Sequence, residues 1–214
     1  MDKIAFLITR PEHDEATYYL SNWSESSIKL AELKGINVID LHLNKANSKE
    51  VESRLNKLSP GFVVFNGHGD ENTIFGHKDE PLITLGKNEK LLASKIVYSI
   101  SCSSAKNLGP ESVKAGAINY TGYDKDFFLV FEPEKFSRPL EDKTAKLFLS
   151  PSVLFVDSII KGNKIKEAFD KSKNLMKDNF RLSLSVDTDS SRFLWWNIQN
   201  FKSHGDVEPS ISHI

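Results

Sequence analysis

Two side chains in this sequence belong to types that perform acyl transfer, and each follows a short apolar run. His68 comes just after residues 62–65 in FVVFNGHG, and Cys102 comes just after residues 96–100 in IVYSISC. A cysteine attacks a peptide carbonyl as the thiolate, and an imidazole can carry the proton that the leaving amine needs. These residue types predict a nucleophile, Cys102, with His68 as its proton-transfer partner.

The chemistry sets two further requirements. A free thiol has a pKa of about 8.5, so a catalytic cysteine needs help in ionising. An imidazolium at His68, and the N-terminus of a helix predicted directly after Ser103, would both lower the pKa of Cys102. The tetrahedral intermediate carries an oxyanion that backbone N–H groups stabilise, and glycine permits close approach of the backbone. The amides of Gly69 and Cys102 are therefore predicted to form an oxyanion hole.

The elements that would position these residues alternate between strands and helices. Apolar runs predict strands at residues 4–9, 36–43, 62–65, 96–100 and 117–122. Helical spacing predicts helices between Asp14 and Lys34, after Asn47, and from Ile165 to Met176. This order predicts an α/β fold with a mostly parallel central sheet and helices on both faces. Because ligands bind at the carboxyl ends of parallel strands, neighbouring strands would bring His68 and Cys102 to one edge.

The composition of the chain limits which functions and partners are expected. The 214 residues are 39% hydrophobic, which predicts one domain spanning 1–214. The net charge of −1 gives no electrostatic reason to expect nucleic acid or a membrane as partner, and no apolar run approaches the length of a membrane span. Cys102 is the single cysteine, so no internal disulfide forms and a reducing, cytoplasmic location is expected. A protein or peptide substrate fits these limits.

The two blocks together resemble the caspase-like cysteine peptidases, whose shared signature is an apolar block ending in His-Gly followed by one ending in a small residue and Cys. AGAINYTGY at 115–123 is similar to a strand of the gingipain-like and CHAT-like branches, and HGDVEPSI near the C-terminus resembles their closing segment. The resemblance implies the caspase-haemoglobinase fold, a Cys-His dyad without an obligatory third member, and endopeptidase activity. It also leaves open an activating partner protein.

The resemblance implies two alternatives for the pocket that receives the residue before the cleaved bond. Arg10 follows the first strand at a place where caspases and legumains use an arginine to accept Asp or Asn. Asp124 and Asp126 follow Tyr123, where acidic residues would instead accept Arg or Lys. The sequence supports both alternatives.

Other functions fit the sequence less well. His68, His77 and His204 have no spacing typical of helical metal ligands, so neither a metal nor a cofactor is predicted. The glycines flanking His68 lack the third glycine of a dinucleotide loop, and no Gly-Xaa-Ser-Xaa-Gly elbow occurs. The main alternative is a caspase-like fold that serves as a non-catalytic interaction or sensing module. Covalent labelling of Cys102 by a peptide electrophile would distinguish the two.

Overall fold

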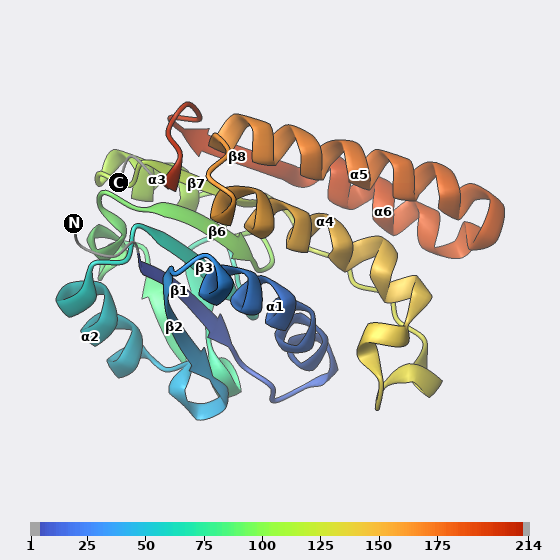
Figure 1. Cartoon of the computed structure of the whole chain (residues 1–214), viewed down its shortest axis with the longest axis horizontal. Coiled ribbons are helices and arrows are strands. Elements are labelled where there is room, and N and C mark those ends of the chain that lie inside the picture. The colour runs from blue at the N-terminus through green and yellow to red at the C-terminus, as the bar shows by residue number, and fades with distance from the viewer. Residues whose placement is uncertain (1–4, 212–214) are drawn as a thin grey trace.

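The central sheet of this computed structural model, which describes residues 5–211, has the strand order β2-β1-β3-β6-β7-β8 (Figure 1). Neighbouring strands run parallel from β2 to β7, and β8 alone pairs antiparallel, at the β7 edge. The strands of this sheet are β1 (Ala5–Arg10), β2 (Asn37–His42), β3 (Phe62–Asn66), β6 (Ile96–Ile100), β7 (Asn119–Tyr123) and β8 (Phe201–Gly205). The predicted α/β architecture with a mostly parallel sheet is confirmed.

Helices cover both faces of the sheet, since β1, β3 and β6 are buried throughout and their apolar side chains alternate between two cores. Figure 1 shows α4, α5 and α6 lying side by side, and their buried residues share one core with α1. The opposite core lies beneath α2 and α3. The bounds of these helices are α1 (Glu15–Leu33), α2 (Ser48–Leu58), α3 (Leu108–Lys114), α4 (Lys143–Ile160), α5 (Ile165–Val186) and α6 (Thr188–Asn200).

Local sequence signals set where the helices begin. Asp14 is the N-cap of α1 and accepts a hydrogen bond from the backbone of Thr17, and Asn47 does the same for α2 through the amide of Glu50. Gly35, with a φ of +75°, follows α1 in the left-handed conformation that glycine favours. These boundaries agree with the sequence prediction to within a few residues.

The prediction of a helix directly after Ser103, beside the candidate site, is wrong. Directly after Ser103 the chain makes turns, and the next helix, α3, begins only at Leu108. Ser103 has a left-handed φ of 56°, unlike the extended backbone of an N-cap, and the hydroxyl of Ser104 bonds Ser99 instead of a helix amide. Cys102 therefore receives no help from a helix dipole.

Between β3 and β6 the chain forms a hairpin, β4 (Thr73–Phe75) with β5 (Pro81–Thr84), and then a short 3-10 helix (Glu89–Leu92). Among the described helices, none is both long enough and apolar enough to span a bilayer.

Candidate active site

The register of β3 and β6 brings His68 and Cys102 to the same edge of the sheet. Asn66 pairs with Ile100, and each candidate residue lies two positions beyond this matched pair. Both line one open pocket at the carboxyl ends of the strands, as the sequence predicts. The other residues of the pocket wall are Ala16, Thr17, Leu20, Gly67, Ile100, Ser101, Phe127, Phe128 and Leu129.

The loop that carries His68 lies directly against the segment that carries Cys102. A Cβ atom added at Gly69 would lie 2.8 Å from the carbonyl oxygen of Cys102 and 2.8 Å from the Cβ of Ser101. At Gly67, with a φ of +151°, an added Cβ would lie 2.3 Å from the carbonyl oxygen of Phe75. Both positions flanking the histidine therefore require glycine for this close approach.

The amides of Gly69 and Cys102 donate no hydrogen bond to any other group in residues 5–211. Unpaired N–H groups beside a pocket are what an oxyanion hole requires. The geometry is thus compatible with the predicted pair of donors.

The thiol of Cys102 is half-buried, and its Sγ lies 3.9 Å from the carbonyl oxygen of Phe127. Burial raises the pKa of the Cys102 thiol, and the negative charge of Asp126 raises it further. This direction is opposite to the one expected from an adjacent imidazolium and a helix N-terminus. A raised pKa favours the neutral thiol, so the attack expected of Cys102 includes the removal of its proton.

Three buried hydroxyls hold the turn around Cys102. Ser99 and Ser101 lie 2.6 Å apart, Ser101 donates to Ser104 at 2.8 Å, and Ser104 lies 3.3 Å from Ser99. Because buried hydroxyls without partners are costly, this closed set stabilises one conformation of the turn.

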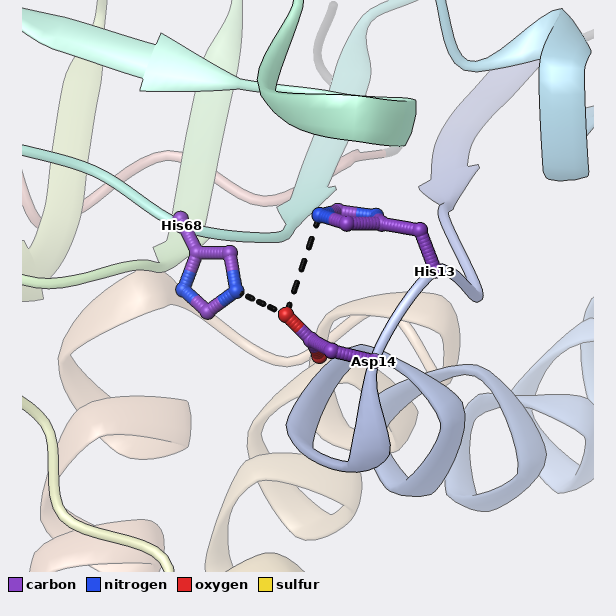
Figure 2. Close-up of side chains that lie close together, drawn as sticks. All are labelled: His13, Asp14 and His68. Atoms are coloured by element: carbon purple, nitrogen blue, oxygen red, sulfur yellow. Dashed lines mark hydrogen bonds and ion pairs between the residues drawn. The ribbon is translucent and has the colours of Figure 1, made fainter.

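Asp14 is the partner of His68, and the sequence analysis did not identify it. Its Oδ2 bonds the Nε2 of His68 (Figure 2), and its Oδ1 accepts a hydrogen bond from the amide of Thr17 at 2.8 Å. Partial burial by itself raises the pKa of the Asp14 carboxyl, but hydrogen bonds from His68 and Thr17 outweigh it and lower that pKa. An ionised carboxylate at Asp14 therefore orients the imidazole ring of His68.

His13 adds a second imidazole to this group. Its Nε2 lies 3.7 Å from Oδ2 of Asp14 and 3.2 Å from Oδ1 of Asp79. The rings of His13 and His68 meet edge to face with centroids 5.6 Å apart. No spacing in the sequence indicates this contact, because His13 and Asp14 come before α1 and His68 follows β3. The one local signal was the position of Asp14 as a helix N-cap.

The three residues predicted for the substrate pocket lie outside its wall. Arg10 makes two hydrogen bonds to Asp40, at 2.9 and 2.6 Å, and is 7% exposed, so its guanidinium is already engaged. The Asp126 carboxylate accepts a hydrogen bond from Ser103 at 3.2 Å, and Asp124 lies 3.9 Å from the amine of Lys202. The pocket wall instead carries no acidic or basic side chain other than the imidazole of His68.

Comparisons with known proteins show which solved structures have a similar fold. No family model matches the chain, and no curated protein sequence does. Among solved structures it is similar to the Arg-specific cysteine proteinase gingipain R, with a TM-score of 0.60 and 12% identity over 96% of this chain and 46% of that one. It is also similar to the complex of RgpB pro- and mature domains from Porphyromonas gingivalis, with a TM-score of 0.59, 10% identity, and 97% and 49% coverage.

The chain spans about half the length of the gingipain chains it matches. At this identity the likeness concerns the fold, and it does not separate a CHAT-like branch from a gingipain-like one. The parallel sheet, its covering helices and this likeness together give the protein a caspase-haemoglobinase-like fold, the fold of the gingipain cysteine proteinases.

Proposed function

We propose that the protein is a cysteine endopeptidase in which Cys102 is the nucleophile and His68 transfers protons. The observation that carries this proposal is the shared pocket: Cys102 and His68 both line it, and the unpaired amides of Gly69 and Cys102 lie next to it. Asp14 acts through His68 as a positioning residue. The substrate is a protein or peptide chain that enters the pocket in extended form.

The reaction follows from these positions. As the sulfur of Cys102 forms a bond to the substrate carbonyl carbon, its proton passes to His68, and the oxyanion receives hydrogen bonds from Gly69 and Cys102. The C–N bond then breaks, and His68 gives its proton to the leaving amine. Water, deprotonated by His68, attacks the thioester, which releases the acid and restores the thiol. Asp14 stabilises the imidazolium that exists between these transfers.

The pocket wall supports a preference for an uncharged, apolar residue before the cleaved bond. Leu20, Phe127 and Leu129 contribute apolar surface to it, and Ala16 contributes a methyl group. An Arg or Lys side chain would have no carboxylate to pair with there, and an Asp would find no guanidinium, which makes burial of either charge unfavourable. In this respect we expect the protein to differ from its Arg-specific structural neighbour.

Two finer assignments accompany the proposal. The gingipain-like or CHAT-like placement rests on AGAINYTGY, part of which forms β7, and both branches remain candidates. The neighbouring structure of a pro-domain with its mature domain supports the idea that a partner protein or domain controls access to the site.

A peptide carrying an electrophile in place of the scissile bond tests the proposal. Cys102 should be labelled by a peptidyl acyloxymethyl ketone with an apolar terminal residue much faster than a free thiol is, and His68→Ala should remove most of that advantage. Peptide cleavage should disappear in both Cys102→Ala and His68→Ala while their circular dichroism is unchanged. Labelling no faster than that of a free thiol would instead favour the interaction or sensing module.

A further inference from the structure

Two imidazoles and one carboxylate converge beside the proposed active site. His13 and Asp14 are consecutive residues just before α1, and His68 follows β3. One nitrogen of each ring and one carboxylate oxygen all lie within 4.8 Å of one another. Figure 2 shows the Asp14 carboxylate between the two rings, with an imidazole nitrogen directed at it from each side.

Imidazole nitrogens and carboxylate oxygens are the ligands that zinc and similar divalent transition metals prefer, and two histidines with one carboxylate leave a fourth position for water. Metal–ligand bonds of about 2.1 Å in a tetrahedron would place the ligand atoms about 3.4 Å apart. The side chains of Asp14 and His68 are 38% and 40% exposed, so they have room to make this adjustment by rotation.

His13 is the least exposed of the three proposed ligands, and its ring is packed between two others. Its side chain is 12% exposed, and it meets His68 and His77 edge to face at centroid distances of 5.6 and 5.5 Å. In this position its Nε2 faces the carboxylates of both Asp14 and Asp79. The packing of His13 therefore orients one ligand in advance. The negative charges of Asp14 and Asp79 favour a cation over an anion beside Nε2 of His13.

We propose that His13, Asp14 and His68 form a binding site for a zinc-class divalent metal ion, and that the bound ion inhibits the peptidase. The inhibition rests on the proposed function, whereas the binding does not. A metal bond at Nε2 of His68 uses the lone pair of that nitrogen, so the ring nitrogen on the side away from Asp14 keeps its hydrogen (Figure 2). The ring then has no position at which to accept the proton of Cys102.

Binding is measured first in the catalytically inert Cys102→Ala protein, by calorimetry with Zn²⁺ and by the visible absorption of Co²⁺. We expect one ion per chain, Co²⁺ bands typical of tetrahedral coordination, and no comparable binding of Mg²⁺. His13→Gln and His68→Gln should each weaken Zn²⁺ affinity by at least about tenfold to a hundredfold. His42→Gln is the matched control, because His42 pairs with Glu12 and is outside the group of three.

Circular dichroism shows whether each variant is folded. If His13→Gln unfolds the chain, Asp14→Asn provides the same test, because asparagine retains the helix cap. The assignment is overturned if both histidine variants bind Zn²⁺ as tightly as the parent, or if Cys102→Ala binds it about tenfold more weakly than the unchanged chain, which would make the thiol a ligand.

The inhibition is measured in the unchanged chain by titrating Zn²⁺ into a peptide-cleavage assay and reversing it with a chelator. His13→Gln, compared with its own metal-free rate, should need at least about tenfold more Zn²⁺ for half inhibition. Cleavage that Zn²⁺ leaves unaffected at concentrations that saturate the site overturns the inhibitory role but leaves the proposed peptidase intact. One-to-one binding without any peptidase activity supports the metal site and overturns the proposed function.

Discussion

Asp14 caps helix α1 with one carboxylate oxygen and bonds the imidazole of His68 with the other. The two bonds connect the carboxylate to the first turn of a helix on one side and to the loop after β3 on the other. The orientation of the proposed catalytic ring therefore depends on where α1 begins.

Replacing Asp14 should separate its two roles. Asparagine is as good an N-cap as aspartate, whereas alanine in that position costs about 1 kcal/mol of stability. Both substitutions remove the negative charge that faces Nε2 of His68. We therefore expect kcat to fall at least about tenfold in each, with KM little changed. Thermal unfolding should distinguish Asp14→Ala from Asp14→Asn, while the two kcat values should be similar. An unchanged kcat in Asp14→Asn would exclude the positioning role.

The reactivity of the thiol should depend on pH in the direction that burial imposes. Burial raises the pKa of Cys102, so the neutral thiol persists at neutral pH and the thiolate forms only above the free value of about 8.5. The rate of alkylation by iodoacetamide should therefore keep rising through that range in the folded protein and level off earlier in urea. Because Cys102 is the single cysteine, the measurement needs no other substitution. A folded-state rate already constant from pH 6 to 8 would indicate a preformed thiolate–imidazolium pair instead.

Gly69→Ala tests the contact between the two loops. A Cβ there would lie 2.8 Å from the Cys102 carbonyl oxygen, so the loops must move apart and displace the proposed oxyanion donors. We expect kcat to fall about a hundredfold, the magnitude typical of losing one such donor. Gly35→Ala is the control: it also meets an unfavourable backbone, with a φ of +75°, but nothing lies within 4 Å of its added Cβ. It should lose stability and keep its turnover number.

The pocket should respond to one added charge. Ala16 lies in the first turn of α1 and lines the pocket, and an acidic residue is favourable near a helix N-terminus. Ala16→Asp should increase cleavage after Arg relative to cleavage after Leu by about tenfold or more, since it supplies the carboxylate that the wall lacks. A positional peptide library measures the ratio, and Ser26→Asp on the exposed surface of the same helix should leave it unchanged. If the unchanged chain already prefers Arg or Asp, this pocket does not receive that residue.

Sequence reasoning predicted the fold, and the placement of His68 and Cys102 at one edge of the sheet, because both depend on local patterns. Apolar runs such as Phe62–Asn66 identify buried parallel strands, and neighbouring parallel strands place whatever follows them at one edge. The pairing of Asp14 with His68 depends instead on how the start of α1 meets a loop 54 residues away, and no spacing rule describes that contact. The β8 strand was missed because its partly exposed FKSHG sequence has little of the apolar character of a buried strand.

The pairing of Asn66 with Ile100 also determines where the chain can accept inserted residues without disturbing the proposed active site. A parallel strand advances about 3.3 Å per residue. A shift of one position in either strand would therefore move its site residue by about that distance along the sheet and turn the side chains of that strand to the opposite face. An insertion at the tip of the β4–β5 hairpin leaves that alignment alone, whereas one extra residue before His68 or Cys102 destroys it. The hydrogen bonds between β3 and β6 thus fix the relative position of His68 and Cys102. The length of the β4–β5 hairpin between these strands does not affect that position.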